Sequence, residues 1–225
     1  MKRILSTLKE KWPEYLLEIL VLIIGIYGAF ALESWNQERI DSNKEIEYLD
    51  QINKEFKKNK EQFEYVVANN SNSLKSCYQF LAEYEKNKPN PDSILIYWKR
   101  LLNTWVFNPS QSSINSLVNS SSIDVIRNEE LKLMLLSWND LILDYSEEEQ
   151  LTLGHVVNDI IPYVEENLDL QKWNNEKENT KLDLGLKNRI IMRVFYLTNI
   201  FENDQHEMEK VRESINKIIE LTEQK

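Results

Sequence analysis

The chain offers few residues whose type and spacing could support catalysis or metal binding. Its two histidines, His155 and His206, lie far apart, and the segment that begins at His206 lacks the second histidine of a zinc-protease helix. Glu147–Glu149 carries three carboxylates, but consecutive helical positions point about 100° apart, so we expect a solvent-facing surface there. No glycine-rich phosphate loop or Gly-x-Ser-x-Gly motif occurs. The sequence therefore predicts no catalytic residue, no metal site and no cofactor, and we expect a protein that is not an enzyme.

Cysteine content and charge exclude two further kinds of site. Cys77 is the only cysteine, so neither an intrachain disulfide nor a cysteine-ligated zinc ion can form. We expect a buried thiol, with an intermolecular disulfide as the alternative. The formal net charge of -10 would repel a phosphate backbone, so the sequence predicts no nucleic-acid partner.

The most informative titratable residue is Glu18, because it precedes an unbroken apolar run, Ile19–Leu32. With the three apolar residues before Glu18, this run covers about 27 Å as a helix, and the hydrocarbon core of a bilayer is about 30 Å thick. Trp12 and Trp35 stand about 35 Å apart on such a helix, where interfacial aromatic residues belong. The sequence therefore predicts a transmembrane helix over residues 15–35, in contact with membrane lipid and anchored at the interfaces by these two tryptophans.

The distribution of basic residues predicts the orientation of this helix. Four precede it and two follow it within fifteen residues: Lys2, Arg3, Lys9 and Lys11, then Arg39 and Lys44. Because positive charge is retained on the cytoplasmic side, we expect residues 1–14 to form a cytoplasmic tail and the bulk of the chain to lie outside. Two alternatives are open: signal-peptidase cleavage after Ala29-Phe30-Ala31, and burial of the run as a core helix.

Glu18 also shares one face of the expected helix with three small or polar residues. At 100° per residue, Gly25, Ala29 and Asn36 lie within about 20° of Glu18. Gly25 and Ala29 are small residues four positions apart, which permits close approach of a second helix. We therefore predict a transmembrane interface formed by Glu18, Gly25, Ala29 and Asn36, with a second copy of the chain or another membrane protein as partner. In the alternative interpretation, Glu18 reaches the membrane surface or is protonated, and faces no protein.

A fixed spacing extends through this region: Glu18, then Gly25-Ile26, Ala29 and Trp35-Asn36, followed by a charged helix. The pattern Glu-x6-Gly-Ile-x2-Ala-x5-Trp-Asn resembles that of a family of small bacterial single-pass membrane proteins that carry a domain of unknown function. The chain departs from the family at Ala31, Glu33 and Ser34, where amides are usual, and residues 116–132 show a weaker resemblance. The resemblance implies an envelope protein of the bacterial inner membrane, and it implies no reaction. With the orientation above, the C-terminal domain would be periplasmic.

Beyond the anchor, residues 36–88 predict one long amphipathic helix that continues from the transmembrane segment. No glycine or proline occurs from Glu33 to Lys88. Apolar residues recur at heptad-like spacing, with Asn59 at one seam position: Leu49, Ile52, Phe56, Phe63 and Val66. The sequence leaves open a break near Asn69-Asn70-Ser71. It also leaves open whether the apolar face forms a coiled-coil stalk or one arm of an intramolecular bundle.

Residues 89–225 predict the remaining helices, because Pro89-Asn90-Pro91 ends the long helix. The expected elements are a helix capped by Asp92 or Ser93 and extending to Phe107, a short helix from Pro109 to Asn119, a helix capped by Asn128 and extending to a kink before Pro162, a loop over residues 171–183 and a last helical region over residues 186–222. The predicted fold class is all-α. One N-terminal transmembrane helix continues into a long helix, which is packed in an extracytoplasmic up-and-down helical bundle.

Two functions fit these expectations. The first is a non-enzymatic, membrane-anchored envelope protein that assembles through its transmembrane helix and presents a helical domain for protein interaction. The alternative is a periplasmic ligand-sensing bundle that signals through a partner protein. Its ligand pocket would be lined by four aromatic residues: Tyr97, Trp98, Trp105 and Trp138. Such aromatic residues more often form a core, so the sequence favours the first function.

Overall fold

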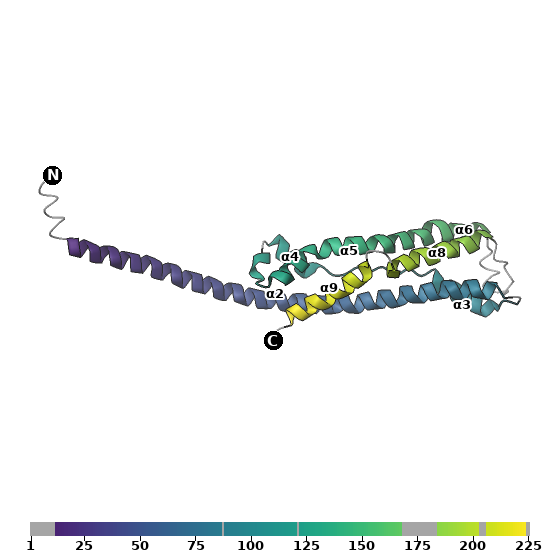
Figure 1. Cartoon of the computed structure of the whole chain (residues 1–225), viewed down its shortest axis with the longest axis horizontal. Helices are drawn as coiled ribbons and strands as arrows, with labels where there is room; N and C mark the ends of the chain where they lie inside the picture. Colours follow the sequence, from purple (N-terminus) through teal and green to yellow (C-terminus); the bar gives the residue numbers. More distant parts are fainter. Residues whose placement is uncertain (1–11, 87, 121, 168–183, 203–205, 224–225) are drawn as a thin grey trace. The chain divides into compact units, whose positions relative to one another are not determined.

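The computed structural model describes residues 12–86, 88–120, 122–167, 184–202 and 206–223 (Figure 1). Helices account for 88 % of these residues, which include no strand, so the predicted all-α class with a long apolar N-terminal helix is confirmed. The elements are α2 (Trp12–Tyr84), α3 (Pro91–Leu101), α4 (Ser112–Asn119), the 3-10 helix η1 (Ile123–Val125), α5 (Glu129–His155), the π-helix η2 (Val156–Ile160), α6 (Ile161–Asn167), α8 (Leu184–Glu202) and α9 (Glu207–Thr222). The chain divides into two compact units, Met1–Tyr48 and Leu49–Lys225. The second unit is called the helical domain below.

Helix α2 is continuous through Asn69-Asn70-Ser71, where the sequence left a break open. Polar side chains of this stretch bond to carbonyl groups one turn back in the same helix. The amide nitrogen of Asn69 donates to the Tyr65 carbonyl at 2.7 Å, and the Ser73 hydroxyl donates to the Asn69 carbonyl at 3.1 Å. Such bonds let short polar side chains remain inside a helix without competing for its backbone N–H groups.

The heptad-like face of α2 is buried against α5 within the helical domain. Phe56 meets Trp138 edge to face, with ring centroids 4.9 Å apart, and Phe63 meets Tyr145 at 5.7 Å. Both partners advance by seven residues, so α2 and α5 run in the same direction (Figure 1). This face therefore packs inside the chain. Trp138 is 1 % exposed, which makes it a core residue rather than the wall of an open pocket.

The N-cap of helix α3 lies two residues before Asp92, the first of the two caps that the sequence suggested. Its N-cap is Asn90, whose Oδ1 accepts the backbone N–H groups of Asp92 and Ser93 at 2.9 and 3.3 Å. Neither Asp92 nor Ser93 is the cap. Pro91 fills the first helical position, where a missing N–H costs nothing.

The same helix ends at Leu101, and the predicted extension to Phe107 is wrong. Residues 102–111, called the linker below, are not helical. The density of apolar residues suggested a helix, but distant side chains bind the backbone groups of the linker, as described in the next subsection. Trp98 is buried (5 % exposed), whereas Trp105 in the linker is half-buried and packs edge-on against Tyr65 at 5.2 Å.

The second half of the helical domain is built on α5. Asn128 caps α5 as predicted, because its Oδ1 accepts the Leu131 N–H at 3.0 Å. Helix α5 then passes into η2 and α6, and this π-helical turn lies where a kink before Pro162 was expected. The last helical region comprises two helices, α8 and α9, and both lie alongside α5 (Figure 1). Residues 171–183, predicted as a loop, lie outside the described residues.

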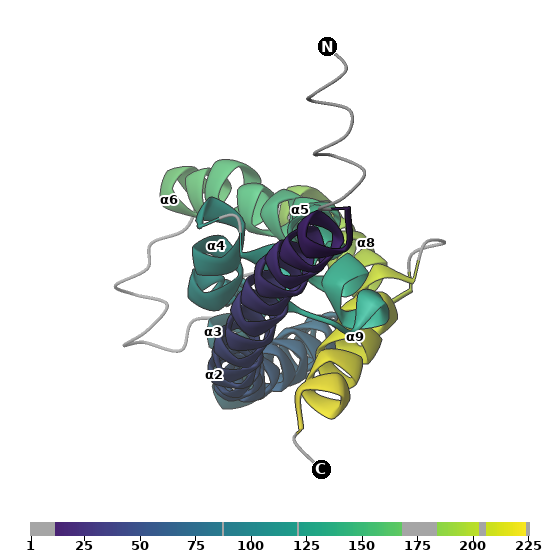
Figure 2. The ribbon, with the colours of Figure 1, turned by 90° about the vertical axis from the view of Figure 1, so that its left-hand side faces the viewer.

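Helices α4 and α9 contact different faces of α2. The Ser113 N–H of α4 bonds to Glu55, whereas Asn53 donates to Thr222 near the end of α9 at 2.9 Å. Two residues of helix separate these positions, so the two contacts point about 200° apart. Figure 2 shows α4 on one side of α2 and α9 on the other.

Candidate functional site

The first candidate site is the apolar N-terminal part of α2. An 18-residue window in this helix has a mean hydropathy of 2.3, and none of it is buried. By length and composition, the helix can cross a membrane. Leu17, Leu22 and Tyr27 are exposed by 66, 62 and 73 %, and they point about 140° apart in succession around the helix. A helix that is apolar all round belongs in a protein core or in lipid, and this part of α2 is not in the core.

All six residues predicted to serve the anchor lie on this helix and are exposed: Glu18, Gly25, Ala29, Asn36, Trp12 and Trp35. Because α2 is continuous, the first four share one face. A Cβ atom added to Gly25 would meet no other atom within 4 Å, so nothing in the described chain covers this face. The Arg39 guanidinium lies 5.9 Å from the centroid of the Trp35 ring. The role of these residues in a membrane stays a prediction.

Within the helical domain, two buried asparagines of α2 bind the linker backbone. The Asn59 Nδ2 donates to the Ser110 carbonyl at 2.8 Å, and its Oδ1 accepts the Ser110 N–H at 2.9 Å. Asn70 makes the same pair of bonds with Trp105, at 2.8 and 3.0 Å. Each asparagine thus satisfies both backbone polar groups of one linker residue. The linker can therefore lie against α2 without secondary structure of its own.

Glu55 continues this row of contacts to the beginning of α4. Its Oε2 accepts the Ser113 N–H at 3.0 Å and the hydroxyls of Ser112 and Ser113 at 2.6 and 2.8 Å. The carboxylate thereby lies at the N-terminus of α4, where the helix dipole favours negative charge. At the other end of the row, the Ser73 hydroxyl lies 2.9 Å from the Asn103 carbonyl.

Arg193 of α8 binds the same linker and is fully buried. Its guanidinium donates to the carbonyls of Leu101 (3.1 Å), Thr152 (2.8 Å) and Asn103 (2.9 Å), and to the Thr104 hydroxyl (2.8 Å). All four acceptors are neutral, and burial lowers the pKa of the guanidinium to about 10. Every nitrogen of the guanidinium donates to a group of the protein itself, so Arg193 does not offer an anion site. Instead, it joins α5, α8 and the linker.

Glu149 contradicts the expected solvent-facing acidic run. It is fully buried, its Oε2 accepts the Phe107 N–H at 2.8 Å, and its Oε1 has no hydrogen-bonding partner among the described residues. Burial raises the pKa of this carboxyl to about 7. Glu147 is exposed, as predicted, because two helical positions separate the side chains by about 200°.

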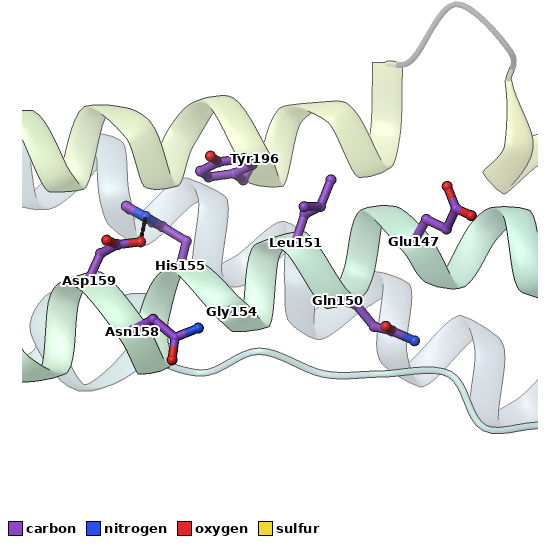
Figure 3. A pocket seen from close by; sticks show the side chains of 8 residues that line it. All are labelled: Glu147, Gln150, Leu151, Gly154, His155, Asn158, Asp159 and Tyr196. Carbon is purple, nitrogen blue, oxygen red and sulfur yellow. Dashed lines mark hydrogen bonds and ion pairs between the residues drawn. The ribbon is translucent and has the colours of Figure 1, made fainter.

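The second candidate site is a groove of about 520 Å³ between α5 and α8, at the point where α5 passes into η2. Figure 3 shows Leu151 and His155 pointing toward α8, with Tyr196 on the opposite wall. Gly154 contributes no side chain, and a Cβ atom added there would lie 3.7 Å from the Asn158 Nδ2. The groove thus combines a missing side chain, an aromatic wall and a π-helical turn, and such turns often mark functional positions.

His155 joins the two walls of this groove. Its Nε2 lies 2.9 Å from the Arg189 carbonyl oxygen of α8, and its Nδ1 lies 3.1 Å from the Asp159 Oδ2 (Figure 3). The ring is 7 % exposed and lies beside Tyr196, with centroids 5.1 Å apart. Both nitrogens face oxygen acceptors, so His155 cannot serve as a metal ligand or a base without losing one of these contacts.

The described part of the chain contains no group of three or more His, Cys, Asp or Glu side chains that could hold a metal ion. Cys77 is buried, and burial raises the pKa of its thiol to about 12, which disfavours the reactive thiolate. Comparison of the chain with protein-family models, curated proteins and solved structures finds no match. The resemblance to the bacterial membrane family therefore stays a prediction.

Sequence reasoning missed the groove, although two signals pointed to it. Gly154 is an isolated glycine inside a helical pattern, which often has a packing reason. Leu136 and Leu143 of α5 and Val157 of η2 are spaced by seven and fourteen residues, and all three side chains are exposed. Tyr196 carries no comparable signal, because tertiary packing alone places it opposite Leu151.

Proposed function

We propose that the chain is a single-pass protein of the bacterial inner membrane, with its N-terminus in the cytoplasm and its helical domain in the periplasm. The exposed apolar part of α2 is the observation that carries this proposal. The excess of basic residues before this segment supports the orientation. The Glu-Gly-Ile-Ala-Trp-Asn spacing supports the bacterial compartment.

The proposed role of the protein is assembly and interaction rather than catalysis. The domain is proposed to be a helical bundle that presents a surface to a protein partner, with the linker returning the chain between the parallel helices α2 and α5 rather than in a strict up-and-down order. The anchor is proposed to associate with a second copy of the chain, or with another membrane protein, through Glu18, Gly25, Ala29 and Asn36. Exposure of this stripe supports the idea, since a polar residue in lipid is stabilised by facing protein.

Fractionation and reporter fusions test the anchoring. The full-length protein should stay in the membrane pellet after alkaline carbonate extraction. Alkaline phosphatase fused to its C-terminus should be active, because that enzyme matures only in the periplasm. Recovery in the supernatant, or an inactive phosphatase with a fluorescent cytoplasmic reporter, contradicts the proposal. An intact mass that lacks the residues up to Ala31 would instead identify a cleaved signal peptide.

Association through the stripe has its own test. Gly25→Leu with Ala29→Leu should abolish association in a membrane two-hybrid assay, because the larger side chains keep the helices apart. Gly28→Leu is the matched control, since position 28 lies about 80° from Glu18 on the helix and a Cβ atom there also meets nothing within 4 Å. Equal association of all variants would remove the interface from the proposal.

A further inference from the structure

The outer face of α5 carries apolar side chains that the helical domain leaves exposed. These residues, called the outer seam below, are exposed by 65, 50, 55, 55 and 50 %: Leu133, Leu136, Leu143, Leu151 and Val157. The opposite face of the same helix supplies core residues such as Leu135 and Ile142, so α5 has two apolar faces. The outer seam consists of exposed apolar side chains of α5 and η2, with the carboxylates of Asp140 and Glu147 between them. Exposed apolar surface that is bordered by polar residues is typical of interaction sites.

The groove beside α8 lies on the same face as the outer seam. Leu151 belongs to both, and Glu147 and Gln150 line the groove in the turn before it. Gly154 leaves a gap one turn further on in the same groove that Tyr196 lines. Figure 3 shows Leu151 on the wall that faces α8. Near its C-terminal end the outer seam thus meets a groove of the kind that receives a knob of a facing helix.

Charge along the outer seam is mainly negative. Between Leu133 and Ile160 the chain contains no lysine or arginine, and Lys132, one residue before the outer seam, is paired with Asp124 and Glu129. It contains six acidic residues over the same stretch, all exposed or half-buried except Glu149: Asp140, Asp144, Glu147, Glu148, Glu149 and Asp159. Across the groove, the Arg189 guanidinium is occupied, because it donates to the Asp159 carbonyl at 3.0 Å and lies 4.0 Å from the Tyr163 ring centroid.

These observations indicate which kind of partner binds the outer seam and the groove. A second copy that docked by the same surface would bring two acidic faces together, and anionic lipid would be repelled. We propose that the outer seam and the groove bind an amphipathic helix of a partner protein, whose apolar stripe is flanked by lysine or arginine residues. This inference names the partner class for the interaction role proposed above.

The geometry fixes the length and contacts of that helix. Leu133 and Val157 are separated by about 36 Å along α5 and η2, so the partner helix has about seven turns. Its apolar residues lie on the outer seam, and one of them occupies the gap at Gly154. Its basic side chains reach Asp140, Asp144 and Glu147, which gives the complex a salt-dependent component.

A designed peptide tests the proposal. The probe is a fluorescein-labelled helix of about 24 residues with leucine at the seam positions of each heptad and lysine elsewhere. It is titrated into the full-length protein in nanodiscs of zwitterionic phosphatidylcholine, whose headgroups add no net electrostatic attraction, and binding to empty nanodiscs is subtracted. We expect saturable binding that weakens with added salt. A scrambled peptide of the same composition, and a leucine-glutamate peptide, should each bind at least about tenfold more weakly.

Protein variants locate the binding surface. Leu143→Glu with Leu151→Glu should weaken binding at least about tenfold, and Gly154→Leu should do so by filling the gap. The matched control is Ile96→Glu with Val118→Glu, which places the same charge on exposed apolar residues of α3 and α4 (49 and 47 % exposed) and should leave affinity unchanged. Circular dichroism melts confirm that each variant is folded, which we expect because the altered residues are not in the core.

Three outcomes overturn the inference. They are binding of the scrambled peptide as tight as that of the probe, affinity unchanged in the seam variants, or an oligomer of the protein that the seam variants dissolve while Gly25→Leu with Ala29→Leu leaves it intact. The last outcome would assign the surface to a second copy. Failure of the fractionation or reporter tests would reject the proposed topology without affecting peptide binding, so the two proposals fail separately.

Discussion

The two ends of helix α2 share one helical backbone but differ in which side chains are exposed and which are buried. From residue 15 to 32 its side chains are apolar except for Glu18, and they are exposed on every side. From residue 49 to 84 one apolar face is buried, and so are several polar side chains: Glu55, Asn59, Asn70, Ser73, Ser76 and Glu83. Each of these buried polar side chains has a hydrogen-bonding partner.

The difference teaches that the helix itself does not decide its surroundings. An α-helix satisfies its backbone N–H and C=O groups internally, so it is compatible with lipid as well as with a protein core. The side chains determine which of these surroundings a stretch of helix can occupy. The apolar side chains of the first stretch need no partners if their surroundings are apolar. The second stretch holds buried polar groups that are tolerated because they have partners: the linker and α4 supply most of them, an α2 carbonyl accepts from Ser76, and the Asn90 N–H donates to Glu83.

The largest expected effect is on the exposed apolar stretch of α2. Ile23→Arg with Ile24→Arg places two charges near the middle of the apolar stretch, each costing about 2.5–3.5 kcal/mol on insertion scales. The variant should move from the carbonate-resistant pellet to the soluble or degraded fraction. Leu133→Arg with Leu136→Arg makes the same substitutions on exposed leucines of the helical domain and should leave fractionation unchanged. Equal behaviour of the two variants would contradict the anchoring.

The next effect concerns Arg193. Removing its side chain in Arg193→Ala leaves buried carbonyls of the linker and α5 without donors and opens a cavity, so the free energy of unfolding should fall by about 3–5 kcal/mol. Chemical denaturation in detergent micelles measures it. Arg212→Ala is the control, because its ion pair with Glu64 is partly exposed and should be worth at most about 1 kcal/mol. A loss below that control would show that Arg193 does not join the elements.

Asn70→Asp tests the buried amide pairs. The carboxylate still accepts the Trp105 N–H, but it presents an oxygen to the Trp105 carbonyl where the amide donated. We expect a loss of about 3 kcal/mol in the free energy of unfolding, since a bond is replaced by repulsion at a buried site. Asn72→Asp, on the exposed side of the same helix, should change stability by less than about 0.5 kcal/mol.

Glu149 makes the stability of the helical domain depend on pH. Burial raises its pKa from the ordinary value of 4.5 to about 7 in the folded state, so folding is favoured when this carboxyl is protonated. Its contribution is fully present below pH 4.5 and is lost as pH rises through about 7. Between pH 5 and 8 this amounts to about 2–3 kcal/mol. Glu149→Gln should flatten this part of the pH profile, while Glu147→Gln should leave it unchanged.

The smallest effect compares a glycine from each region. Gly154→Ala should raise the free energy of unfolding of the helical domain by about 0.5–1 kcal/mol, because the added Cβ makes only an ordinary contact and reduces the freedom of the unfolded chain. Gly28→Ala, also in a helix and with open space around it, should leave the unfolding transition unchanged. A matching gain from Gly28→Ala would mean that the apolar stretch of α2 and the helical domain unfold together.

The local features of the fold could be predicted from the sequence, and the long-range ones could not. The helical anchor, the end of α2 before Pro91 and the cap at Asn128 follow from residues close to one another in the chain. The linker does not. Its apolar residues suggested a helix, but its backbone groups are bound by Asn59, Asn70 and Arg193, which lie about 35 to 90 residues away.

The candidate sites divide in the same way. The anchor residues are specified by spacing along one helix, so the sequence named them. The groove depends on which face of α8 meets α5, and no pattern within α8 states that Tyr196 lies opposite Leu151. Burial of Glu149 was missed for a related reason. The Phe107 N–H, which binds the buried carboxyl group, comes from a residue 42 positions away in the sequence.

The paired asparagines also act as a measure of length. Asn59 and Asn70 are eleven residues apart on a helix, which is about 16.5 Å, while Ser110 and Trp105 are only five residues apart. Five residues reach at most about 16.5–18 Å, so the linker between these two points must be almost fully stretched. A chain with one residue fewer there falls short of the second asparagine, and one residue more leaves slack that must bulge. This stretch should therefore tolerate changes of side chain far better than changes of length.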